Sequence, residues 1–122
     1  MGSVAEKGQG MSTPASLKVL LVIPLYNHGA TVAEVVQRAG ITGYPVLVVD
    51  DGSSDGGINH VKHLECFTLR LDENRGKGVA LRAGAAYAAE LGYDAIVTID
   101  ADGQHDPIES AELIREALSG AW

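Results

Sequence analysis

The sequence predicts an α/β fold in which an open, mainly parallel sheet is flanked by helices. Two observations lead to this prediction. Apolar runs alternate along the chain with helical patterns, and the runs are continuous stretches of Val, Leu and Ile without polar alternation. Such runs are typical of strands covered on both faces, as in a parallel sheet. With 122 residues the chain has the size of one domain with one core.

The first β-α-β unit occupies three consecutive segments. The run KVLLVIP (18–24) predicts a strand, TVAEVVQRAG (31–40) a helix and YPVLVVDD (44–51) a second strand. Thr31 and Glu34 have the spacing of a capping box. We therefore expect this pair to cap the first helix.

The same alternation continues through the second half of the chain. CFTLRL (66–71) predicts a third strand, VALRAGAAYAAELG (79–92) an alanine-rich helix and DAIVTID (94–100) a fourth strand. The second crossover has only His60–Leu64 for a helix, which is barely more than one turn. A last helix is expected to begin at Asp106 and Pro107, with Glu109 completing a second capping box, and to end at Gly120.

Composition and charge limit the classes of function. The net charge is −7, with 9 basic and 16 acidic residues, which argues against a nucleic-acid binder. No apolar run reaches the length of a membrane span, no signal pattern is present, and the single Cys66 fits a reducing compartment, so we expect a cytoplasmic domain. Residues 1–17 are interpreted as a flexible leader or a cloning remnant, which leaves 18–122 as the folded part.

Nearly every unusual polar cluster of the sequence follows a predicted strand. In open α/β sheets the ligand crevice lies outside the carboxyl ends of the strands, so we expect these clusters to converge on one site. The four clusters are PLYN (24–27), DDGS (50–53), DENRGKG (72–78) and DADGQ (100–104).

The last cluster predicts a metal site. Asp100, Asp102 and Gln104 alternate, so in an extended segment their oxygens share a face, and such hard donors suit magnesium or manganese. The competing interpretation is a helix-capping loop. Asp106 already fills that role, which favours the metal.

Two further clusters point to a phosphorylated nucleoside without deciding it. Asp51 could accept hydrogen bonds from a base or ribose, or could simply close a turn. Arg75 and Lys77 precede the N-terminus of a helix, where phosphates bind, although the segment could also be a solvated loop. Tyr26 could stack on a base or pack over the strand end.

Taken together and in this order, VIPLYN, VVDDGSSDG, NRGKGVALRAG and DADGQHDP resemble the nucleotide-binding half of family-2 glycosyltransferases. The closest-looking branch is that of the dolichol-phosphate-mannose synthases, and the resemblance covers Lys18 to about Leu118. It implies a GT-A fold, which is Rossmann-like, and an enzyme that transfers a sugar with inversion from a UDP- or GDP-linked donor. The acceptor is unknown and a lipid phosphate is one candidate, which would place the enzyme at the cytoplasmic face of the membrane.

The resemblance also implies roles for individual residues. Asp100, Asp102 and Gln104 would hold Mg²⁺ or Mn²⁺, with Asp100 contacting either the metal or the ribose. The residues expected along the nucleotide sugar are Pro24, Tyr26, Asn27, Asp51, Arg75, Lys77 and Asp100.

Family members continue past the equivalent of Trp122, so the domain is expected to be truncated and the catalytic base to lie beyond this residue. Two alternatives remain open. One is a nucleotide- or metal-binding fragment without catalysis. The other is a haloacid-dehalogenase-like phosphatase, with Asp100 of the TIDADG segment as nucleophile and Asp102 as acid or base.

Overall fold

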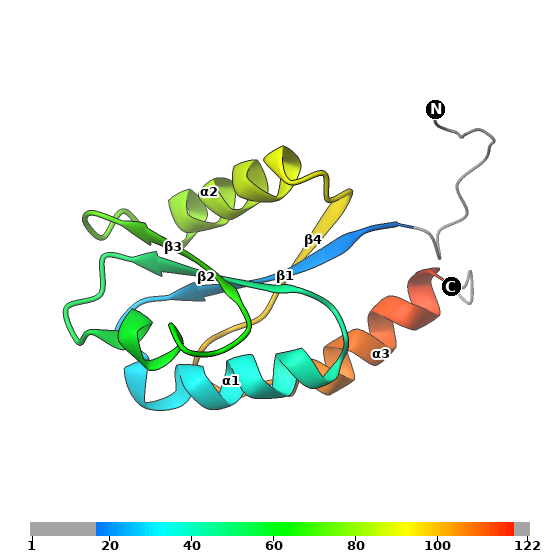
Figure 1. Cartoon of the computed structure of the whole chain (residues 1–122), viewed down its shortest axis with the longest axis horizontal. Helices are drawn as coiled ribbons and strands as arrows, with labels where there is room; N and C mark the ends of the chain where they lie inside the picture. Colours follow the sequence, from blue (N-terminus) through cyan, green and yellow to red (C-terminus); the bar gives the residue numbers. More distant parts are fainter. Residues whose placement is uncertain (1–16, 119–122) are drawn as a thin grey trace.

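The structure is a computed structural model that describes residues 17–118, with four parallel strands in one sheet. The strand order is β3-β2-β1-β4, and helices cover both faces (Figure 1). This arrangement confirms the predicted α/β fold class. The elements in chain order are β1 Val19–Leu25, α1 Gly29–Ile41, β2 Val46–Asp51, the 3₁₀ helix η2 Gly57–His60, β3 Phe67–Leu71, α2 Lys77–Glu90, β4 Ala95–Thr98 and α3 Pro107–Leu118.

Two apolar layers hold the sheet between the helices. Alternate residues of β1 point to opposite faces, because side chains alternate along a strand. Leu21 and Ile23 pack with Val32 and Val35 of α1, whereas Leu20, Val22, Leu47 and Val49 pack with Ala80 and Ala88 of α2. Figure 1 shows α2 on one face and α1, α3 and η2 on the other. β1 and β2 are therefore buried on both faces, as their continuous apolar sequences predict.

The prediction that Thr31 and Glu34 cap the first helix is wrong. Helix α1 begins at Gly29, two residues before Thr31, and its first N–H donates to the carboxylate of Asp55 at 2.9 Å. Asp55 also accepts a bond from the Gly57 N–H at 2.9 Å. A carboxylate distant in sequence thus supplies the cap, and these two N–H groups, that of Gly29 the stronger influence, hold the pKa of Asp55 below its usual value.

The second crossover also differs from the prediction. In place of a helix over His60–Leu64, the chain forms the short 3₁₀ helix η2 and then turns. Ile58 and Val61 are buried against the α1 side of the sheet, so these two side chains fill the space that a longer helix would cover.

Helix α3 begins where the sequence predicts. Asp106 accepts the Ile108 N–H at 3.0 Å, which is the bond of an N-terminal cap, and it forms a two-pronged ion pair with Arg38 of α1. The predicted end at Gly120 and the predicted leader lie outside the described residues. No helix among residues 17–118 is long and apolar enough to cross a membrane.

Candidate functional site

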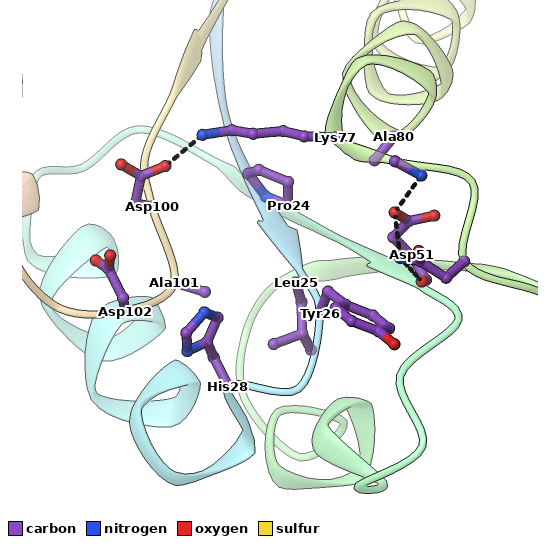
Figure 2. A pocket seen from close by; sticks show the side chains of 12 residues that line it. Pro24, Leu25, Tyr26, His28, Asp51, Lys77, Ala80, Asp100, Ala101 and Asp102 are labelled. Carbon is purple, nitrogen blue, oxygen red and sulfur yellow. Dashed lines mark hydrogen bonds and ion pairs between the residues drawn. The ribbon is translucent and has the colours of Figure 1, made fainter.

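The strand order places a crevice next to β1. From β1 the chain passes through α1 to β2 on one side, whereas β4, which follows α2, pairs with the other side of β1. At such a switch point, open α/β sheets bind their ligands beyond the carboxyl ends of the strands. A cavity of about 380 Å³ lies there (Figure 2). Its lining residues are Pro24, Leu25, Tyr26, His28, Asp51, Asn74, Gly76, Lys77, Ala80, Asp100, Ala101 and Asp102.

Lys77 and Asp100 form an ion pair at the cavity wall. The Lys77 ammonium lies 2.7 Å from an Asp100 carboxylate oxygen, and Figure 2 shows this bond joining the start of α2 to the segment after β4. This hydrogen bond holds the pKa of Asp100 below its usual value. Both side chains are about half exposed, with 59% of Lys77 and 42% of Asp100 accessible, so a ligand can reach either one.

Asp51 organises the loop on the opposite side of the cavity. Its carboxylate is 3% exposed and accepts the backbone N–H groups of Arg75 and Gly76, each at 2.9 Å. The side-chain amide of Asn74 donates a third bond to it, also at 2.9 Å. Because these bonds fix the backbone just before α2, Asp51 determines where Lys77 enters the cavity.

Asp50 has a different task from its neighbour. It is fully buried, accepts the Ser53 N–H at 2.9 Å and forms an ion pair with Arg70 of β3, also at 2.9 Å. These contacts are those of a turn that fastens β2 to the edge strand. Of the two adjacent carboxylates, only Asp51 lines the cavity.

Asn27 does not line this cavity, but its hydrogen bonds hold the chain segments around it in place. Its backbone has φ +55°, its N–H donates to the Ser53 hydroxyl at 3.0 Å, and its side-chain oxygen accepts the Ser54 N–H at 2.9 Å. These bonds join the ends of β1 and β2. Its neighbour Tyr26 lines the cavity and is 46% exposed, as stacking on a base requires.

Arg75 and Gln104 also lie outside the cavity lining. The Arg75 guanidinium pairs with Glu73 at 3.2 Å, and 61% of its side chain is exposed. Gln104 lines a neighbouring cavity of about 430 Å³ between α1 and the N-terminus of α3. Asp102 lines both cavities, and its carboxylate accepts the Gln104 N–H at 3.0 Å. The structure thus brings Asp100, Asp102 and Lys77 together in one cavity lining. Arg75 and Gln104 are not part of that lining.

The oxygen donors at this edge of the sheet fit a magnesium-type ion. Among residues 17–118 no group of three or more His, Cys, Asp and Glu side chains is arranged to hold a metal. Mg²⁺, however, commonly takes one or two carboxylates together with phosphate oxygens of its substrate. Asp100 and Asp102 line one cavity and supply these two carboxylates, so the metal prediction is compatible with the structure when a phosphorylated ligand completes the donor set.

Several residues that shape the site were not individually assigned a role in it from the sequence. His28 immediately precedes α1 and lines the cavity, and Asn74 bonds Asp51 from the loop before α2. Thr31 donates to the backbone oxygen of Ala101 at 2.6 Å. His28 could have been predicted from its position after the Tyr-Asn pair, whereas Thr31 contacts a residue 70 positions away and carries no local signal.

Comparison with known proteins decides the family. A model of glycosyl transferase family 2 matches residues 20–121, which is most of the chain. The chain belongs to glycosyltransferase family 2. This confirms the predicted family, and the match is not to the phosphatase family of the second alternative.

Two curated relatives are similar to this family-2 chain over most of its length. A UDP-N-acetylglucosamine–dolichyl-phosphate N-acetylglucosaminyltransferase of Methanococcus voltae is 32% identical over 119 residues, covering 83% of this chain and 47% of the relative. An uncharacterised protein of Methanocaldococcus jannaschii is also 32% identical, over 102 residues and 42% of its length. The chain thus spans less than half of each relative. The first name agrees with the predicted dolichol-phosphate branch.

The fold is similar to that of a solved structure. The crystal structure of S. aureus TarS 1–349 superposes with a TM-score of 0.53 over 86% of this chain and 31% of that chain, at 20% identity. This similarity supports the GT-A-like α/β fold of the family-2 chain.

Proposed function

We propose that this chain is the nucleotide-sugar-binding part of an inverting glycosyltransferase that uses a nucleoside-diphosphate sugar, UDP- or GDP-linked, and a divalent cation. One observation carries the proposal: the cavity at the β1/β4 switch point brings Lys77, Asp100 and Asp102 together beside Asp51 and Tyr26. A cationic group and two reachable carboxylates next to an exposed ring match the diphosphate and the base of such a donor.

The charges in the cavity explain why a cation is needed. A diphosphate brings negative charge to a wall that already carries Asp100 and Asp102, and Lys77 offsets only one of these charges. In the proposal, Asp100 and Asp102 hold Mg²⁺ or Mn²⁺, with Gln104 as the predicted third ligand. The ion supplies positive charge to the leaving diphosphate and so lowers the barrier to breaking the glycosidic bond.

The chain's own residues would orient the donor around this charge. Lys77 enters the cavity at the start of α2, where free helix N–H groups add to its attraction for phosphate. The exposed Tyr26 ring offers a surface for the base on the other side. Pro24 adds apolar surface to the cavity lining, and Asp51 keeps the loop before α2 in place.

A polyprenyl phosphate is the acceptor that we propose. Support comes from the Methanococcus voltae relative, whose name describes transfer to dolichyl phosphate. A phosphate oxygen is already a nucleophile at neutral pH, so this acceptor needs less help from a general base than a sugar hydroxyl would. Such an acceptor would bring the enzyme to the cytoplasmic face of a membrane.

The test is a calorimetric titration of the chain with UDP and with GDP, each in manganese and in chelator. The proposal expects manganese-dependent binding of one nucleotide, and loss of that dependence in Asp102→Asn. Glu90→Gln is the matched control, because it removes one carboxylate at the far end of α2, about 15 Å along the helix from Ala80, which lines the cavity. Absence of nucleotide binding in every condition would contradict the donor site, and an unchanged Asp102→Asn titration would contradict the metal assignment.

A further inference from the structure

We infer that Thr31 is a positioning residue for the acidic loop, by which we mean residues 99–106 with Asp100 and Asp102. The inference rests on the proposed function for what these carboxylates bind, and on the structure for how they are held. Thr31 lies in the first turn of α1, on a different element from every predicted ligand of the metal.

The Thr31 hydroxyl is directed at the acidic loop. Two carbonyl oxygens lie within reach, that of Ala101 at 2.6 Å and that of His28 at 3.3 Å. A hydroxyl has one proton, and a donor–acceptor distance of about 2.7 Å is the most common for this type of bond. The proton therefore goes to Ala101, and the bond joins α1 to the loop.

The carbonyl that Thr31 holds belongs to the peptide unit that joins Ala101 to Asp102. Since this unit is planar, fixing its oxygen also fixes the N–H of Asp102 and limits rotation of the backbone there. The Asp102 carboxylate is tied to the same loop by its bond from the Gln104 N–H. The direction in which Asp102 points thus depends on the plane that Thr31 holds.

The neighbouring contacts anchor only the two ends of the acidic loop, so the bond from Thr31 is what orients its centre. At the entry, the Ile99 N–H donates to the Val22 oxygen at 2.9 Å. At the exit, Arg38 donates two bonds to Asp106, at 3.1 and 2.7 Å. Gly103 lies between these anchors with φ +79°, a conformation that glycine adopts freely, so it adds little rigidity of its own.

The test compares Thr31→Val, which keeps the shape and loses the hydroxyl, with Thr31→Ser, which keeps the hydroxyl. Thr42→Val is the matched control, because Thr42 also lies at an end of α1 and donates to a backbone oxygen, that of Ala39, at 2.6 Å. Two quantities are measured for each variant. One is amide hydrogen exchange of the acidic loop without ligand, and the other is the gain in nucleotide affinity on adding manganese.

In Thr31→Val, the amide hydrogens of the acidic loop should exchange faster. The gain in nucleotide affinity on adding manganese should be about tenfold smaller, as for other substitutions of residues that hold metal ligands in place. The affinity of this variant for nucleotide in chelator should not change, and Thr31→Ser should match the unsubstituted chain in both measurements. Thr42→Val should leave both measurements at the loop unchanged.

The inference is overturned if Thr31→Val leaves loop exchange unchanged, if Thr31→Ser fails to restore it, or if Thr42→Val has the same effects. Failure of the proposed function gives a different result. The unsubstituted chain would then show no manganese-dependent binding at all, while the exchange measurement would still support or overturn the role of Thr31.

Discussion

Replacing Asp51 with asparagine should lower the free energy of unfolding by about 2 to 3 kcal/mol. One Asp51 oxygen accepts Asn74 and Gly76, and the other accepts Arg75. An amide can keep the first two bonds on its oxygen, but its NH₂ group then faces the Arg75 N–H, donor against donor. A bond to a charged group contributes about 1.5 to 3 kcal/mol net, and the two bonds that remain lose their charged acceptor.

Urea denaturation measures this change directly. Asp72→Asn is the control, because Asp72 also follows a strand and is exposed. We expect the control to stay within about 0.5 kcal/mol of the unsubstituted chain, as surface substitutions usually do. If Asp51→Asn also stays within that range, Asp51 does not anchor the loop before α2, and our account of how Lys77 is placed fails.

Gly52→Ala should destabilise far more than Gly92→Ala in the same denaturation assay. Both glycines have positive φ, +71° and +85°. An added Cβ at Gly52 would lie 2.4 Å from backbone atoms of the next loop, whereas at Gly92 nothing lies within 4 Å. Similar losses of stability in the two variants would refute the close approach at Gly52. Lys77→Ala should raise the pKa of Asp100 toward its ordinary value, because the lowering hydrogen bond from Lys77 is lost, and a carboxyl-carbon NMR titration measures this change. Because the pKa of Asp100 is lowered in the folded chain, its ion pair with Lys77 stabilises the fold at pH values above the unfolded pKa. This stabilisation is lost as the pH falls through the folded pKa, so the acid-dependent part of the stability should be smaller in Lys77→Ala. Lys77→Ala should also weaken UDP or GDP more than the bare nucleoside, with the exposed Lys62→Ala as control, and equal losses would contradict its place beside the diphosphate.

The arrangement of strands could be predicted because its signal is local. A run such as Val46–Asp51 is apolar up to its last two residues, which marks both a doubly covered strand and its carboxyl end. The rule that ligands bind at those ends then selects the edge of the sheet at which the cavity lies. Lys77, Asp100 and Asp102 line one cavity for this reason, although they come from two different connections.

The start of α1 could not be predicted because its cap is distant in sequence. A local rule reads Thr31 and Glu34 as a capping box, whereas the N–H of Gly29 is satisfied by Asp55, 26 positions away. Gly29 and Gly57 allow this approach: a Cβ on either would lie 3.0 Å from an Asp55 oxygen. Residue type alone does not reveal such a pairing.

The predicted ligand set illustrates a related difficulty. Alternation of Asp100, Asp102 and Gln104 suggests one shared face only if the segment is extended. The segment turns instead, with Gly103 at φ +79°, and Gln104 lines the neighbouring cavity. Spacing thus predicted that Asp100 and Asp102 lie close together, as the shared cavity shows, but carried no information on the turn that separates Gln104 from them.

Asp51 at the end of β2 and the two carboxylates after β4 have different surroundings, and under the proposed function this difference would let an acidic chain bind a diphosphate. Asp51 is buried and its carboxylate accepts hydrogen bonds from the chain's own N–H groups, so it adds little repulsion toward a phosphate. Asp100 and Asp102 line the cavity, and in the proposed function it is their charge that Lys77 and a cation would balance. Substitution of Asp51 should therefore change stability more than binding, whereas substitution of Asp100 or Asp102 should change binding more than stability.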